Sequence, residues 1–284
     1  MDTETAVRSR ERSRTTSGVS WIATSAFASA VGVVVAFLFD HLGLALAGWL
    51  ADREPVLYHN EVVFQAGGSE LALAGGAALS LVAGIFFLTL YPGARRYDAA
   101  RLTVLWVVLH CFRQGFMQLV MVPFSESSNL SRAFNSLDVP AGLDLVVAAG
   151  GLVGMVSVAL ASAPAFLAYA ERVSQIETPT KRFQFTARLA LIPAVVGPLI
   201  TTPIFLPDDT GLIPSLPFLG LFAVATVVAS LGTRNVRVEA QRVRTGWSWL
   251  PLIWLVGFAL VFQFLLRRGV VIPPSLSDPF VESL

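Results

Sequence analysis

Four polar side chains lie inside one apolar stretch of membrane-spanning length, residues 101–124. They are His110, Arg113, Gln114 and Gln118. An imidazole can accept and release protons, a guanidinium can hold an anion, and amides both donate and accept hydrogen bonds. Such groups are costly at mid-membrane depth, so we expect them to face the protein interior.

These four side chains fall on one face of the predicted helix. At ~100° per residue they share an arc of about 140°. Arg113 lies about midway along the span, where a charge costs ~3 kcal/mol on an insertion scale unless a partner or water offsets it. The sequence therefore predicts a partner for Arg113.

Asp144 is the best candidate for this partner, because it is the only acidic residue inside any of the predicted spans. In depth it lies nearer to Gln118 than to Arg113. We therefore expect a polar ladder from His110 and Arg113 through Gln118 to Asp144. Two interpretations stay open: the ladder only ties the third span to the fourth, or it lines a functional polar cavity.

A weaker cluster of metal-ligand residue types is predicted on the outer side of the membrane: His41, His59 and Glu61, with Asp40 beside them. Imidazole and carboxylate ligands can hold zinc, and His110 could add a third nitrogen if the first loop folded inward. The spacing matches no metal motif. An ordinary polar turn at residues 58–60 is therefore preferred, and we expect no metal and no cofactor.

Composition places the chain in the membrane class. Hydrophobic residues make up 55% and charged residues 14%, against about 25% charged in a soluble domain. A net charge of +1 gives no argument for nucleic-acid binding. The single Cys111 excludes a disulfide framework and a thiolate zinc cluster, and the one lysine among many arginines indicates a high-GC prokaryotic source.

Hydropathy predicts an all-α integral membrane protein with about seven transmembrane helices. The predicted spans are about residues 18–39, 69–90, 101–123, 142–170, 187–206, 212–231 and 247–266. They form one transmembrane domain, 18–266, between a polar tail at 1–17 and a second tail at 267–284. One straight helix from 18 to 51 would overshoot a ~30 Å hydrocarbon core, so we expect residues 41–51 to form an interfacial or re-entrant piece.

Charge predicts the orientation. With the amino terminus in the cytoplasm, fifteen of the 20 lysines and arginines lie on the inner side and four on the outer side, with Arg113 inside the membrane. This division follows the positive-inside rule. We expect a multi-pass protein of the cell membrane with a cytoplasmic amino terminus and an outer carboxy terminus.

Prolines and small residues indicate how the helices pack. Three prolines interrupt the span 187–206, which should be kinked or broken. Small residues at four-residue spacing in 69–90, and the pair Gly150 and Gly154, allow close helix contact. These faces offer a surface for homo- or hetero-oligomers within the lipid bilayer.

Function is weighed among three classes. A structural or accessory membrane protein is preferred, with the polar cluster as interhelical ties. A small-solute or ion permease using that cluster comes second. An intramembrane enzyme with His110 as acid or base comes third, because it would need a nucleophile or a metal, and the sequence offers only Cys111 and the outer histidines as weak candidates. A phosphate loop, a dinucleotide fingerprint and a Gly-x-Ser-x-Gly motif are all absent from the sequence.

Overall fold

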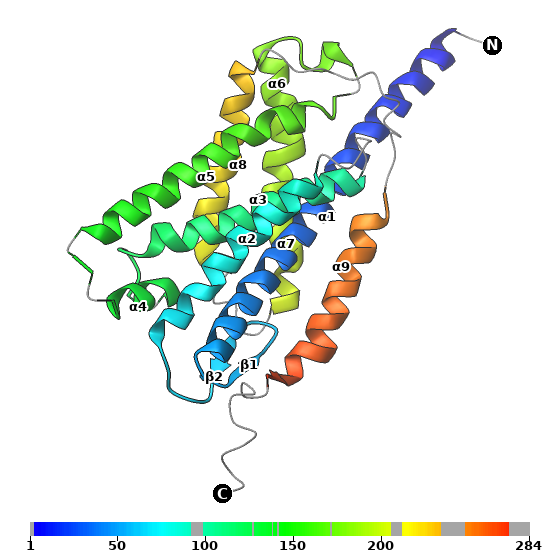
Figure 1. The fold of residues 1–284 in the computed structure, drawn as a ribbon. Helices are drawn as coiled ribbons and strands as arrows, with labels where there is room; N and C mark the ends of the chain where they lie inside the picture. The colour runs from blue at the N-terminus through cyan, green and yellow to red at the C-terminus, as the bar shows by residue number, and fades with distance from the viewer. Residues whose placement is uncertain are drawn as a thin grey trace, which may run out of the picture.

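The fold of the chain is given by a computed structural model. It describes residues 3–91, 99–126, 128–137, 139–140, 142–170, 172–205, 212–233 and 248–272. These residues form a helical bundle with one small sheet at one end (Figure 1). The α-helices are α1 Thr3–Leu50, α2 Gly75–Leu90, α3 Ala99–Met121, α4 Asn129–Asn135, α5 Leu143–Leu167, α6 Pro179–Thr186, α7 Ile192–Phe205, α8 Leu212–Gly232 and α9 Leu250–Leu260.

Tighter and wider helical turns extend several of these helices. A 3₁₀ turn, Glu70–Ala74, leads into α2, and another, Val173–Gln175, precedes α6. A π turn at Ala187–Leu191 joins α6 to α7. The π turn Val261–Leu265 and the 3₁₀ turn Leu266–Arg268 prolong α9.

In the part of the chain that the structure describes, six helical segments are long and apolar enough to cross a membrane. They are Trp21–Leu50, Glu70–Leu90, Ala99–Met121, Leu143–Leu167, Pro179–Phe205 and Leu250–Arg268. A shorter apolar stretch, Leu216–Gly232 within α8, coincides with the remaining predicted span. The all-α membrane class predicted from the sequence fits this fold.

The first helix is longer than the sequence predicted. It runs without a break from Thr3 to Leu50, so the prediction that residues 41–51 form a separate interfacial or re-entrant piece is wrong. Its apolar part has 30 residues, or ~45 Å at ~1.5 Å per residue, and a tilt accommodates such an excess over the hydrocarbon thickness. The helix passes Asp40 because that carboxylate is buried and hydrogen-bonded within the bundle.

The helix of the fifth predicted span is also longer, and it is not broken. Pro179 to Phe205 form one helical segment, so Lys181 and Arg182, predicted to lie in a loop, belong to α6. Its irregularity is the π turn, in which the Ile192 N–H donates to the Ala187 carbonyl. This wider turn directly precedes Pro193, whose ring would otherwise clash with the preceding turn.

Arg182 caps the C-terminal end of α8. Its guanidinium donates to the carbonyl oxygens of Ser230 at 3.1 Å and Leu231 at 3.0 Å. It also donates to the carbonyls of Ile176 and Glu177. The last carbonyls of a helix lack partners within it, so one cation here satisfies them and complements the helix dipole.

A three-stranded antiparallel sheet was not predicted from the sequence. Strands β1 Pro55–Leu57 and β2 Val62–Phe64 form a hairpin after α1, and β3 Val270–Val271 pairs with β1 from beyond α9. The polar turn predicted at residues 58–60 is the hairpin turn, closed by the Tyr58 N–H on the Glu61 carbonyl. Gly269, with a φ of 75°, allows the chain to turn from α9 into the sheet.

Helix α1 lies at the centre of the bundle. In Figure 1 it runs, in blue, past α3 to the hairpin, while α9, in orange, ends beside the same sheet. One apolar core surrounds the middle of α1 and includes Phe37, Phe205 and Phe262. A second core joins α3 to α5 and α8 around Trp106 and Phe166.

The small-residue faces are in part used within the chain. A Cβ on Gly76 would lie 2.6 Å from Asp40 Oδ1, and one on Gly84 would lie 3.1 Å from the Phe112 ring. Gly154 packs on Phe116, whereas a Cβ on Gly150 would meet no atom within 4 Å. The ridge on α2 thus serves α1 and α3, and Gly150 faces away from the bundle.

Candidate functional site

A ladder of polar contacts joins α1 to α3. Trp106 Nε1 donates to Ser25 Oγ at 2.9 Å, His110 Nε2 and Ser29 Oγ lie 3.0 Å apart, and the Gln118 amide donates to Asp40 Oδ1. The partners are separated by 81, 81 and 78 residues. A nearly constant separation means that the two helices run parallel, with matching residues at matching depth.

His110 is enclosed by the parallel pair. Its side chain is 1% exposed and its ring stacks on Trp106 with centroids 5.5 Å apart. A Cβ on Gly32 would lie 2.7 Å from His110 Cδ2, so only glycine in α1 leaves room for this ring. Its Nδ1 has no hydrogen-bond partner among the residues that the structure describes.

Arg113 lies one turn further along α3 and is 2% exposed. Its terminal nitrogens contact Met117 Sδ at 3.7 Å and Gln114 Oε1 at 3.3 Å. Its Nε has no partner, and the ion pairs formed within the described ranges do not include it. Charge-assisted N–H···O bonds are usually ~2.7–2.9 Å, so this guanidinium is weakly satisfied for a buried cation.

Asp40 is the acidic member of the cluster. It is 7% exposed and accepts a hydrogen bond from Gln118. It also interacts with the Gln114 amide and electrostatically with Arg113 and the neighbouring His41. The Asp40 carboxylate therefore lies among Gln114, Gln118 and Arg113, whereas His110 contacts Ser29 of the same helix α1. The sequence did not indicate Asp40 as a partner of these side chains.

Asp144, the predicted partner, lies elsewhere. It is half-buried in the first turn of α5, and the hydrogen bonds and ion pairs of the described residues connect it to none of the four polar side chains of α3. The error follows from the boundary placed at residue 39: it left Asp40 outside the membrane and made Asp144 the only acidic residue within a span. A constant offset between polar residues of the first and third spans would have indicated Asp40 and Ser29.

The weak metal candidates do not converge. His41 is buried and its Nδ1 lies 2.7 Å from the Phe37 carbonyl, one turn back in α1. His59 is buried in the hairpin turn, and Glu61 is exposed beside it. Within the part of the chain that the structure describes, no three His, Cys, Asp or Glu residues are placed to hold a metal ion.

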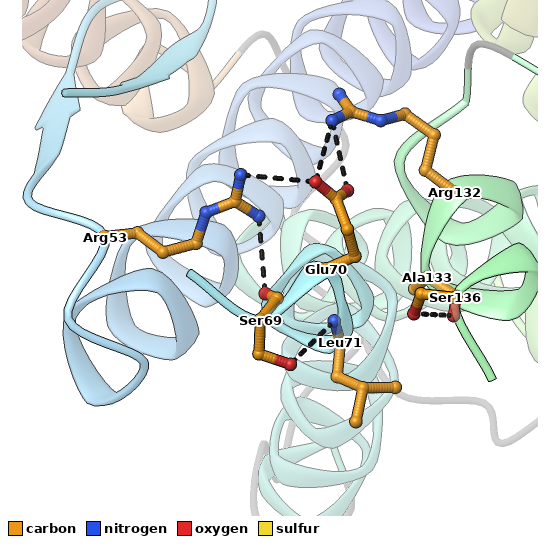
Figure 2. A network of polar contacts seen from close by, with 7 residues as sticks. All are labelled: Arg53, Ser69, Glu70, Leu71, Arg132, Ala133 and Ser136. Atoms are coloured by element: carbon orange, nitrogen blue, oxygen red, sulfur yellow. Dashed lines mark hydrogen bonds and ion pairs between the residues drawn. The ribbon is translucent and has the colours of Figure 1, made fainter. Parts of the chain in front are cut away.

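A second polar network lies beside the sheet. Figure 2 shows Glu70 between Arg53 and Arg132, with contacts of 3.6 Å and 3.0 Å. Arg53 also donates to the Ser69 carbonyl at 3.3 Å and lies 4.5 Å from the centre of the Phe64 ring. The network fixes the end of α1, the start of the α2 segment and α4 to one another.

Comparison of the chain with known protein families, curated proteins and solved structures gave no match. The geometry of the α1–α3 cluster is therefore the basis on which a function can be inferred.

Proposed function

We propose that the chain is a structural or accessory multi-pass protein of the cell membrane, in which the polar cluster holds α1 against α3. One observation carries this proposal: His110 and Arg113 are 1% and 2% exposed. A permeation path or an active site has to admit a solute or substrate. The contacts of His110 with Ser29 and of Gln118 with Asp40 join α3 to α1, and such interhelical ties are worth ~1 kcal/mol each.

A small-solute or ion permease is the second candidate. The buried nitrogens of Arg113 and His110 that lack partners favour it, because polar groups at membrane depth mark solute paths when they are not structurally satisfied. An enzyme using His110 is less supported. The hydroxyl that contacts its ring, Ser29 Oγ at 3.0 Å, is fully buried, and no group of three metal-ligand residues occurs among the described residues.

Liposome flux distinguishes the first two candidates. Wild type and Arg113→Gln would be reconstituted, and the flux of protons, alkali cations, halides and small neutral solutes would be measured in each. The accessory function predicts flux equal to empty liposomes for both proteins. Wild-type flux that Arg113→Gln abolishes, with Arg132→Gln unaffected as the surface control, would establish the permease instead.

The proposed architecture has seven spans, an inner amino terminus and an outer carboxy terminus. The pairing of β1 with β3 supports the odd number. This pairing brings the C-terminal ends of α1 and α9 to the same side of the membrane. The chain between these two ends must then cross the membrane an even number of times. The long apolar segments after α1 give five crossings, and α8 supplies the sixth.

Cysteine labelling tests this topology. Cys111 is fully buried, so the wild-type background should be silent. Val63→Cys in β2 and Val271→Cys in β3 should both react with an impermeant maleimide from outside intact cells, whereas Val173→Cys should react only after lysis. Labelling of Val63→Cys and Val271→Cys from opposite sides would refute seven spans.

Helix faces that remain open support association in the bilayer. A Cβ at Gly150 of α5, Gly220 of α8 or Gly257 of α9 would meet no atom within 4 Å. These positions leave smooth surfaces for a neighbouring helix. Blue-native electrophoresis of wild type and Gly150→Leu would reveal an oligomer that depends on the α5 face.

A further inference from the structure

The structure shows a shortage of hydrogen-bond acceptors around α3 in the middle of the bundle. Arg113 carries five N–H donors and no acceptor. The thioether and amide oxygen that it contacts, at 3.7 Å and 3.3 Å, are weak partners for a cation. Its Nε–H is buried and has no hydrogen-bond partner within the described ranges.

His110 adds a second donor to the same face. Among the described residues, the Ser29 hydroxyl has one hydrogen-bond contact, the imidazole Nε2, and we assign its proton to that contact. Nε2 is then the acceptor, and the proton of the neutral ring is on Nδ1. Since Nδ1 also lacks a partner, the ring presents a free N–H one turn from Arg113.

Asp40 does not relieve this shortage. Its carboxylate accepts from Gln118 and also interacts with Gln114. It acts on Arg113 through space without forming one of the ion pairs of the described residues. The carboxylate offsets the charge of the guanidinium in part and leaves its N–H groups without a strong acceptor.

From these donors we propose that Arg113 and His110 bind a small inorganic anion of the halide class inside the bundle. An anion is a pure acceptor, and it matches two buried N–H donors one helical turn apart on α3, one of them cationic. The burial of both side chains excludes a lipid headgroup, whose glycerol and acyl chains could not follow it. This anion site goes beyond the proposed accessory function and is compatible with an anion that stabilises the bundle.

Thermal unfolding in detergent tests the site. The full chain would be incubated for hours in sodium chloride, bromide or gluconate at equal ionic strength, because a sealed site exchanges slowly. A ligand that binds only the folded state raises Tm, and we expect a saturable rise of about 2–5 °C in halide for wild type. Arg113→Gln should lose the rise, and Arg132→Gln, on the exposed outer network, should keep it.

A second measurement does not depend on the folding of Arg113→Gln. Bromide quenches indole fluorescence on contact, and Trp106 is itself buried and stacked on His110. The difference between wild type and Trp106→Phe should show a slowly developing bromide-dependent component. A wild-type Tm equal in halide and gluconate, or no quenching of Trp106 after long incubation, would overturn the proposal and leave ordered water as the occupant.

Discussion

Gln118 of α3 donates a hydrogen bond to the Asp40 carboxylate of α1 across 78 residues of sequence. The contact ends a series in which α1 and α3 keep nearly the same offset from Ser25 onward. Two parallel transmembrane helices have no short connection to fix their register. The polar series supplies that register, and a shift by one residue would break every contact in it.

The first prediction concerns the coupling between these two residues. Asp40→Ala and Gln118→Ala should each lower the free energy of unfolding, and the double variant should lose less than the sum. We expect a coupling energy of about 1–2 kcal/mol. Urea unfolding in mixed micelles would measure it.

Asp144→Ala is the matched control for that cycle. It removes an acidic side chain near the end of another span, and it should change stability by less than about 0.5 kcal/mol. Strict additivity of Asp40→Ala and Gln118→Ala, or a loss for Asp144→Ala as large as theirs, would contradict the assigned partner.

Gly76→Ala should destabilise the bundle. The added Cβ would lie 2.6 Å from Asp40 Oδ1, so the carboxylate or the helix must move, at a cost of about 1–3 kcal/mol. Gly150→Ala places the same methyl group in open space and should be neutral or slightly stabilising. Thermal unfolding of both variants gives the comparison, and equal Tm values would show that α2 does not pack on Asp40.

Arg182→Ala should loosen the C-terminal end of α8. It removes the donor to four carbonyl oxygens, and we expect a loss of about 1–2 kcal/mol. The neighbour Lys181 makes only an exposed pair with Glu177, so Lys181→Ala should cost below about 0.5 kcal/mol. Hydrogen exchange of the last turn of α8 would rise in the first variant alone.

Glu70→Gln should weaken the network of Figure 2. Two arginines lose their common carboxylate, but Glu70 and Arg132 are partly exposed, which limits the loss to about 1 kcal/mol. The difference from wild type should shrink in high salt, because partly exposed ion pairs are screened. A loss that did not respond to salt would mean that packing, and not charge, holds the network.

The spans and the polar face of α3 could be predicted because each depends on a local pattern. Apolar length identified the helices, and a helical wheel was enough to place His110, Arg113, Gln114 and Gln118 on one side. Neither apolar length nor a helical wheel shows which residue of another helix a side chain will contact. Ser25 and Ser29 have ordinary places within the first span. Their contacts with Trp106 and His110 follow only from the packing of α1 on α3.

The wrong helix boundary at Asp40 and the missed sheet have one physical cause. The surroundings of a residue in the folded chain change which structure that residue can adopt. Asp40 looked like the end of a helix because a carboxylate in lipid is costly, yet in the bundle it is paired and the helix continues. The sheet was missed because its strands have two or three residues each. Such short strands are stable through their position between two helix ends, and their own sequence carries little β signal.

The pairing of Val56 with Val271 and of Leu57 with Val270 has a consequence for biogenesis. When the chain enters the bilayer from its amino terminus, the β1–β2 hairpin is present first. The third strand, β3, becomes available only after α9 has been inserted. Completion of this sheet is therefore one of the last steps of folding. Protection of the β1 and β3 amides from hydrogen exchange would therefore indicate that the helices between these two strands have been inserted.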